Sequence, residues 1–353
     1  MWRAILHVHY IRIGKRDAER IKRRLIRSRL LDTRALIEHS DSYVYFPTQN
    51  ISKTTIKKVI GLPAEIVERS ERKASGQLGF RERLQKVLSK EEYQEAPKGY
   101  DIIGNIATVD VSDTLSKKEK EIAQVIMQIH PSVETVLAKE GAVSGKYRTR
   151  KFRHVLGKKN FTATYRENNC TFVFDVRKSF FSNRLSFERS RITRLVKKKE
   201  NVLVMFAGIG PFAIEIAKAH PDCSVVAIEL NRSAYKEMGN NIKLNKVSNV
   251  LPVLGDVKES VRKFHGFADR IIMPLPRESI SFLDSALAAA KRKSILHVYA
   301  FGRSESAYVD VAAAIMANAK KNHYRAAVKS QRVARPYSAK EIEVVLDVAI
   351  QKS

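Results

Sequence analysis

The residues with the clearest chemical meaning form a glycine turn between an apolar segment and a helical one. The turn reads Val204-Met205-Phe206-Ala207-Gly208-Ile209-Gly210-Pro211, and glycines let a backbone turn tightly and approach a ligand closely. Glu229 ends the next apolar segment, 21 residues after Gly208, where a carboxylate can accept hydrogen bonds from both hydroxyls of a ribose. The spacing therefore predicts a site for a nucleoside cofactor.

Two kinds of nucleoside cofactor compete for this turn, and the flanking residues distinguish them. A dinucleotide site favours Gly-x-Gly-x-x-Gly with a pyrophosphate at the helix N-terminus, but Ala213 occupies the third glycine position and Pro211 begins the helix. S-adenosylmethionine has no phosphate and needs only the close approach and polar partners. Asp256 follows the third apolar segment, where an acid commonly takes the adenine amino group in S-adenosylmethionine-dependent methyltransferases. The sequence therefore favours a methyltransferase over a dehydrogenase.

These residues must be positioned by a sheet, because residues 184–353 alternate between strand-like and helical segments. Such alternation predicts an α/β fold with a doubly wound, mainly parallel sheet and helices on both faces. Segments 324–333 and 341–349, joined by a Pro-Tyr-Ser turn, predict a terminal antiparallel hairpin, as in the class I S-adenosylmethionine methyltransferases. The other strands predicted in this catalytic domain cover residues 202–206, 224–230, 250–254, 270–273 and 294–299.

Two smaller units precede this domain in the chain. Residues 71–183 contain several strand-like segments and a helix over 115–129, so we predict an α+β module that contacts RNA, with one strand over residues 100–111. Residues 1–70 hold 15 basic and 7 acidic residues, and they predict a small basic domain.

The charge of the chain points to a polyanionic partner. Lys and Arg number 65 against 37 Asp and Glu, a net charge of +28, and RNA or DNA is the first candidate. Residues 146–199 hold 17 Lys/Arg and only three acids, with aromatic residues interleaved. Basic side chains neutralise phosphates and aromatic rings stack on bases, whereas the alternative is a solvated basic surface.

Composition also excludes several classes of protein. No stretch of 18 residues is free of charge, so we expect no membrane-spanning helix, and the N-terminus does not have the order of a secretory signal. Cys170 and Cys223 are too few for a disulfide framework or a complete zinc site. We expect a cytoplasmic protein without a metal.

At this point the sequence resembles a known family. The cofactor turn at residues 205–212 looks like that of the archaeal and eukaryotic tRNA (guanine-N1)-methyltransferases that act on position 37, beside the anticodon. The resemblance extends upstream through residues 129–139, 145–150 and 181–189, and it covers at least residues 100–290. It implies S-adenosylmethionine as cofactor and tRNA as partner, and it implies that residues 1–70 bind tRNA. We expect a monomer that binds no DNA.

Methylation of guanine N1 needs a base for the N1 proton and a positive group for the charge that grows on O6. Glu188 is the only acid among the seven basic residues from Arg177 to Lys197, but the residues alone favour a salt-bridged carboxylate in the first turn of a helix. The resemblance implies that Glu188 is the base and that Arg148 holds O6. We expect further substrate contacts from Phe180, by stacking or else as core, and from Arg150, Arg184, Arg189 and Pro276.

One turn departs from the family pattern. The family usually has Asn-Leu-Pro after the fourth strand, with the Asn helping to hold the target base, whereas this chain has Met273-Pro274-Leu275-Pro276. Pro274 has neither a side-chain donor nor a backbone N–H, so that contact is lost. The turn resembles that of an archaeal subgroup of the family, whose members also methylate C7 of 4-demethylwyosine at the same position. We count Pro274 with Phe206, Gly208, Gly210, Glu229 and Asp256 as the predicted cofactor site.

Two alternatives stay open at this stage. A methyltransferase for another RNA site, such as ribosomal RNA, would share the glycine turn but would give no reason for Arg148 and Glu188. A non-catalytic RNA-binding protein is the other alternative, and the intact glycine turn with its two acids speaks against it.

Overall fold

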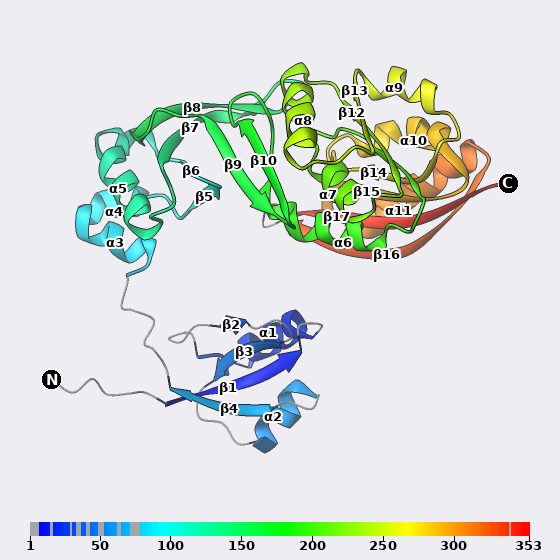
Figure 1. Cartoon of the computed structure of the whole chain (residues 1–353). Helices are drawn as coiled ribbons and strands as arrows, with labels where there is room; N and C mark the ends of the chain where they lie inside the picture. Colours follow the sequence, from blue (N-terminus) through cyan, green and yellow to red (C-terminus); the bar gives the residue numbers. More distant parts are fainter. Residues whose placement is uncertain are drawn as a thin grey trace. The chain divides into compact units, whose positions relative to one another are not determined.

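The structure of the chain is a computed structural model. It describes residues 7–14, 17–28, 30–32, 37–39, 43–48, 53–61, 65–70, 78–338 and 340–353. The chain divides into two compact units, residues 1–79 and 80–353 (Figure 1). The domain boundaries at residues 70 and 183 stay predictions, and residues 71–77, just after the first boundary, lie outside the described residues.

The unit of residues 1–79 is a small antiparallel sheet with two helices. The strands lie in the order β2-β3-β1-β4, and Ile21 and Leu25 of the first helix pack on Ile11 and Phe46 of the sheet. The elements are β1 (His7–Gly14), α1 (Ala18–Arg27), β2 (Glu38–His39), β3 (Tyr43–Thr48), α2 (Lys53–Ile60) and β4 (Glu65–Ser70).

The unit of residues 80–353 begins with three helices and a four-stranded sheet, β5-β6-β7-β8. The elements are α3 (Phe80–Val87), α4 (Lys90–Glu95), β5 (Tyr100–Ile103), β6 (Ile106–Val109), α5 (Glu119–Ile129), β7 (Thr135–Ser144) and β8 (Thr149–Gly157). The prediction of one strand over residues 100–111 was wrong, because β5 and β6 are antiparallel strands joined at Gly104. Gly104 has φ +59°, and a Cβ there would lie 1.8 Å from the carbonyl oxygen of Thr164. An apolar run does not reveal such a turn.

The predicted fold of the catalytic part is confirmed. Its seven strands lie in the order β13-β12-β11-β14-β15-β17-β16, parallel from β13 to β15, with β17 antiparallel to both of its neighbours. Around this sheet the elements are α6 (Ser186–Leu195), β11 (Asn201–Val204), α7 (Pro211–Ala219), β12 (Ser224–Glu229), α8 (Arg232–Leu244), β13 (Val250–Leu254), α9 (Val257–Ser260), β14 (Ala268–Met273), α10 (Leu283–Ala289), β15 (Ala290–Arg303), α11 (Ala307–Lys321), β16 (Tyr324–Pro336) and β17 (Glu341–Lys352).

The sheet separates two apolar cores, because alternate residues of a strand point to opposite faces. In β11, Val202 and Val204 pack with residues of α6, α7 and α8, whereas Leu203 and Met205 pack with residues of α10 and α11. The parallel strands all end at the same edge of the sheet. The glycine turn, Glu229, Asp256 and Pro274 therefore meet there although they are far apart in sequence.

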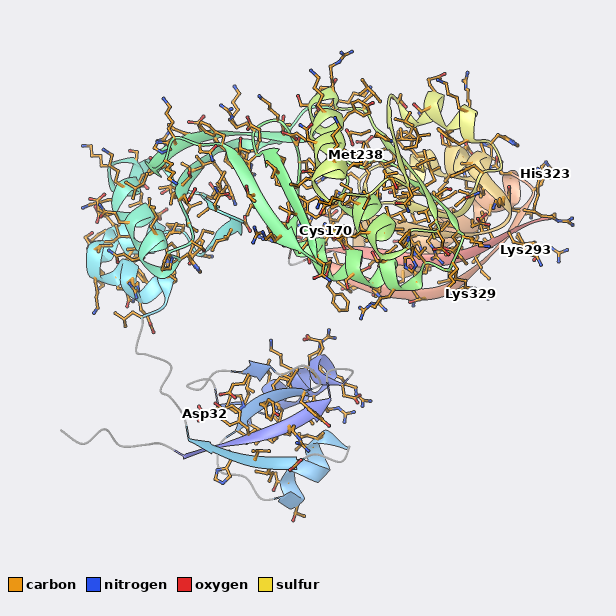
Figure 2. All side chains as sticks on the ribbon, viewed as in Figure 1. Asp32, Cys170, Met238, Lys293, His323 and Lys329 are labelled. Atoms are coloured by element: carbon orange, nitrogen blue, oxygen red, sulfur yellow. The ribbon has the colours of Figure 1, made fainter. Side chains whose placement is uncertain are left out.

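A hairpin of β9 (Thr162–Glu167) and β10 (Cys170–Asp175) lies beside α8, as the labels Cys170 and Met238 show in Figure 2. The free edge of β10 is covered by α8. Asn245, Asn241 and Glu237 accept hydrogen bonds from the N–H groups of Thr171, Val173 and Asp175 at 2.9, 2.8 and 2.7 Å. Four helical residues rise about 6 Å and two strand residues about 6.8 Å. The spacing of every fourth residue on α8 therefore matches the spacing of every second residue on β10, and the match holds over three contacts.

This match predicts that Asn241→Ala destabilises the chain by about 1–3 kcal/mol, because the N–H of Val173 loses its acceptor, the buried amide of Asn241. Denaturant unfolding followed by circular dichroism measures the change. Asn240→Ala is the control, since Asn240 is exposed on the same helix. Equal stability of the two variants would contradict the role of this contact.

Candidate active site

The glycine turn is held in a conformation that ordinary side chains avoid. Phe206, Gly208 and Gly210 have φ of +55°, +58° and +89°. A Cβ on Gly210 would lie 2.8 Å from Cγ of Met238, so this glycine lets the turn pack directly on α8. The N–H of Ala207 donates to the carbonyl of Ile228 at 2.9 Å, which fixes the turn to the neighbouring strand.

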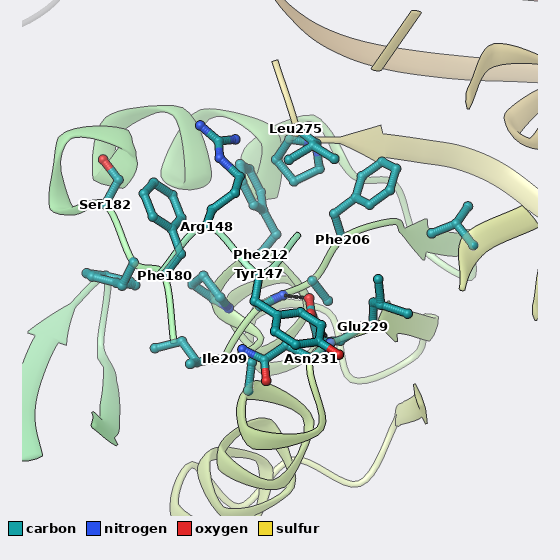
Figure 3. A pocket seen from close by; sticks show the side chains of 18 of the residues that line it. Tyr147, Arg148, Phe180, Ser182, Phe206, Ile209, Phe212, Glu229, Asn231 and Leu275 are labelled. Atoms are coloured by element: carbon teal, nitrogen blue, oxygen red, sulfur yellow. Dashed lines mark hydrogen bonds between the residues drawn. The ribbon is translucent and has the colours of Figure 1, made fainter. Parts of the chain in front are cut away.

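Glu229 lies against this turn with its carboxylate in the cavity shown in Figure 3. One carboxylate oxygen accepts from the N–H of Gly208 and the other from the N–H of Asn231, both at 2.7 Å. Burial raises the pKa of Glu229, while these two donors favour its charged form. Each oxygen keeps acceptor capacity, so the carboxylate can still bind a pair of hydroxyls.

The cavity has apolar walls and polar groups suited to an adenosine. Phe206 and Phe282 meet edge to face with centroids 4.8 Å apart. Asp256 caps α9 through the N–H of Lys258 at 3.0 Å and lies 3.7 Å from Nζ of Lys146. The lining residues include Tyr147, Arg148, Phe180, Phe206, Ala207, Gly208, Ile209, Phe212, Glu229, Leu230, Asn231, Asp256, Val257, Pro274, Leu275, Glu278 and Phe282.

The structure thus brings five of the six predicted cofactor residues to one cavity: Phe206, Gly208, Glu229, Asp256 and Pro274. The sixth, Gly210, does not line the cavity, but it lets the turn pack on α8. Asn231 also lines the cavity, and its side chain caps α8 through the N–H of Ser233 at 2.9 Å. Asn231 is not among the predicted cofactor residues, although its place two residues after Glu229 was a usable signal.

Arg148 stands where the cofactor cavity joins a second, basic groove. Its Cζ lies 5.1 Å from the centre of the Phe180 ring, within reach of a cation–π contact. Burial and then Arg277 lower the pKa of Arg148, but a guanidinium keeps its charge at any physiological pH. Among the described residues, the basic side chains that line the second groove are Lys139, Arg148, Arg150, Arg184, Arg277 and Arg335.

The groove contains residues that the sequence did not single out. Arg277 follows β14, and Arg335 lies near the end of β16. Both come close to Arg148 only when the sheet is folded, so no local pattern in the sequence marks them. Of the predicted substrate residues, Phe180 and Arg150 line the groove, and Arg184 lines it while pairing with Asp101 at 2.7 Å.

The remaining predicted residues are buried. Pro276 is buried, and its carbonyl accepts from the N–H of Phe301 at 3.2 Å. Arg189 lines the cofactor cavity but is 2% exposed, and its guanidinium lies 2.6 Å from Glu167. Glu188 is also 2% exposed and lines neither cavity. Its carboxylate accepts from Arg191 at 2.9 Å and from the hydroxyl of Tyr299 at 3.2 Å.

One group of metal-ligating side chains occurs among the described residues, His220, Asp222 and Cys223. The ring of His220 lies 2.8 Å from the carbonyl of Thr193, and the thiol of Cys223 donates to the carbonyl of Lys197 at 3.1 Å. Both ligand atoms are therefore engaged by the backbone. In the part of the chain that the structure describes, we find no helix with the length and apolar character that a membrane crossing needs.

Known proteins resemble the chain over nearly its whole length. Residues 163–327 match the TRM5/TYW2 methyltransferase domain, residues 80–160 the TYW2 N-terminal domain and residues 11–55 the tRNA methyltransferase 5 N-terminal domain. The tRNA (guanine(37)-N(1))-methyltransferase Trm5b of Pyrococcus abyssi is 33% identical over 340 residues, which are 96% of this chain and 98% of that protein. Its crystal structure covers 97% of this chain and 99% of its own, at 32% identity and a TM-score of 0.71.

Two further relatives bear on the substrate. The structure of a complex of aTrm5 and tRNALeu covers 96% of this chain and 99% of its own, with 28% identity and a TM-score of 0.68. The tRNA 4-demethylwyosine(37)-methyltransferase Taw21 of Saccharolobus solfataricus is 35% identical over 212 residues, which are 59% of this chain and 80% of that protein.

The cavity predicts that Glu229→Gln weakens binding of S-adenosylmethionine by about 10- to 100-fold, because an amide cannot accept from both N–H groups and both hydroxyls. For the wild type, affinity should fall as the pH drops through the raised pKa of Glu229, since protonation removes acceptors. Calorimetric titration measures both effects. Glu259→Gln, an exposed acid on α9, is the control, and unchanged affinity in Glu229→Gln would contradict the assignment.

Proposed function

The chain belongs to the TRM5/TYW2 family of methyltransferases, and from this premise we propose that it methylates N1 of guanosine 37 in tRNA. The observation that carries the proposal is the position of Arg148, which lines both the S-adenosylmethionine cavity and the basic groove. A base placed in the groove would lie next to the cofactor there. The relative of 33% identity over nearly the full length supports guanosine 37 as the target.

The chain's own residues account for the parts of the reaction. S-adenosylmethionine supplies an electrophilic methyl group on its sulfonium. Arg148 donates hydrogen bonds to O6 of the guanine, where negative charge grows as N1 attacks, and Phe180 packs on the same side as Arg148. Glu188 takes the N1 proton, so that the products are 1-methylguanosine, S-adenosylhomocysteine and a protonated carboxyl group.

Proton removal requires a rearrangement of the cavity wall. Glu188 lies on α6 just after Leu185, which lines the cofactor cavity, but its own carboxylate faces Arg191 and Tyr299. N1 and this carboxylate can meet only if the base enters past Leu185 or if the Glu188 side chain turns toward the cavity. We therefore infer that binding of tRNA and completion of the active site are coupled.

The basic groove supports tRNA as the substrate. Arg150, Arg184, Arg277 and Arg335 line it beside Arg148, and such side chains neutralise phosphates. We propose that residues 1–70 form a second tRNA-binding surface and that residues 71–183 form a module that contacts RNA. We further propose that the protein acts as a cytoplasmic monomer.

Mass spectrometry of the nucleosides in a guanosine-37 tRNA transcript tests this function. Wild type should yield 1-methylguanosine at position 37, whereas Arg148→Ala and Glu188→Gln should lower the single-turnover rate by about 10²- to 10⁴-fold with unchanged cofactor affinity. Arg194→Ala, on the exposed side of α6, is the control and should keep full activity. Methylation at another position, or full activity in both active-site variants, would overturn the proposal.

A second activity, methylation of C7 of 4-demethylwyosine at the same position, is favoured by the turn at Pro274. Pro274 lines the cofactor cavity in place of the usual Asn and presents no donor to a guanine there. The pyrrolidine ring of Pro274, which lacks the amide of that Asn, leaves more room for a tricyclic base. The relative Taw21, although matched over only 59% of this chain, supports the same idea.

Transfer of labelled methyl groups to tRNA that carries 4-demethylwyosine tests the second activity. We expect label at C7, and we expect Pro274→Asn to lower this transfer at least tenfold more than transfer to guanosine 37, because the new amide narrows the site. Label on guanosine 37 alone would rule out the second activity and leave the first intact.

A further inference from the structure

A row of buried polar side chains runs under α6 and begins at Glu188. Oε2 of Glu188 accepts from Nε of Arg191 at 2.9 Å, and from the hydroxyl of Tyr299 at 3.2 Å. The Nη atoms of Arg191 donate to the two oxygens of Asp347 at 2.6 and 3.2 Å. One guanidinium is therefore shared between two carboxylates, one on α6 and one on β17.

The next member of the row is a neutral histidine whose tautomer follows from its partners. Nδ1 of His297 lies 2.6 Å from Asp347, and Nε2 lies 2.6 Å from an Nη of Arg270. Because a guanidinium only donates, Nε2 must be the acceptor, and the proton sits on Nδ1, which donates to Asp347. Burial lowers the pKa of His297 despite the nearby Asp347, in agreement with a neutral ring.

The last member of this row of polar side chains, Arg270, also has hydrogen-bond partners. Arg270 pairs with Glu200 at 2.7 Å and donates to the carbonyl of Leu195 at the end of α6. Although burial raises the pKa of Asp347, the hydrogen bonds from His297 and Arg191 hold it below its usual range. Asp347 therefore stays a fixed negative charge and Arg191 cannot turn fully toward Glu188.

We propose that Asp347 and Tyr299 are positioning residues that set the proton affinity of Glu188 in opposite directions. The proposal rests on the proposed function, in which Glu188 accepts the N1 proton. Asp347 draws Arg191 away and adds negative charge nearby, so it makes Glu188 a stronger base. Tyr299 donates a hydrogen bond to the carboxylate and so favours its charged form, which makes Glu188 a weaker base.

Among the described residues, three groups contact Glu188 from the elements packed around it, and a fourth, Asp347, acts on it through Arg191. Arg191 is on α6, Tyr299 on β15, Asp347 on β17, and Arg332 of β16 lies 3.7 Å from Oε1 of Glu188. Burial and Glu188 raise the pKa of Tyr299 well above its usual value, so its hydroxyl remains a donor throughout the working range.

Single-turnover methyl transfer to guanosine-37 tRNA, measured between about pH 5 and pH 9, tests this inference. The rate should rise with pH as Glu188 loses its proton. Asp347→Asn should move the midpoint of this rise down by about one pH unit and lower the plateau several-fold, because Glu188 becomes a weaker base. Tyr299→Phe should move the midpoint up by about half a unit to one unit, because the charged carboxylate loses a donor.

The controls separate positioning from folding. Asp269→Asn removes a carboxylate that pairs with Lys291 at 2.7 Å outside the row, and its profile should match wild type. Thermal melting and S-adenosylmethionine binding establish that each variant is folded, and the conservative Tyr299→Phe decides alone if Asp347→Asn does not fold. In Glu188→Gln the rise itself should disappear.

Two failures are distinguishable. If wild type does not methylate guanosine 37, the proposed function and this inference both fall. If wild type methylates but the two midpoints stay in place or move in the same direction, only the inference is overturned.

Discussion

The loop of Phe180 and Ser182, which lines both cavities, is held by a buried ion cluster around Arg189. Its Nε lies 2.6 Å from Glu167 of β9 and 3.5 Å from Glu215 of α7, and one Nη donates to the carbonyl of Ser182 at 3.1 Å. Burial and then Glu167 raise the pKa of Glu215, while Arg189 lowers it. Arg189 thus lies between two buried carboxyl groups and leaves neither without a partner.

This cluster explains why the loop that carries Phe180 can be shaped by distant parts of the chain. The carbonyl of Ser182 accepts a hydrogen bond from Arg189, and the preceding strand β10 is hydrogen-bonded to α8. Helix α8 in turn packs against the glycine turn through Met238. The catalytic sheet, the hairpin and the substrate loop therefore share one set of contacts. A change in any of these contacts would move Phe180 relative to the cofactor cavity.

Most of the cofactor residues predicted from the sequence come together at one cavity, because each of them carries a local signal. A glycine turn, an acid at the end of the next strand and an acid after the third strand each mark themselves, and parallel strands bring them together. The surroundings of Glu188 are not local: Arg191 meets Asp347 across 156 residues of sequence. No spacing rule connects such residues, and a helical first-turn acid gives no sign of a tyrosine on β15. The strand predicted over residues 100–111 failed for a related reason, since the need for Gly104 comes from the approach of Thr164.

Residues 146–199, with 17 Lys/Arg and three acids, carry half of the net charge of +28. In residues 146–199 the three acids are turned inward, with Glu167 and Glu188 9% and 2% exposed and Asp175 engaged by Arg177 at 2.7 Å. Glu167 and Glu188 neutralise the interior arginines Arg189 and Arg191, whereas Asp175 pairs with the exposed Arg177 and Lys178. The arginines of the groove are balanced instead by acids from other parts of the chain, because Asp101 pairs with Arg184, Glu343 pairs with Arg335, and Glu278 lines the groove beside Arg148. The charge of the groove is therefore set by elements that are far apart in the sequence, and a count of charges within residues 146–199 does not reveal it.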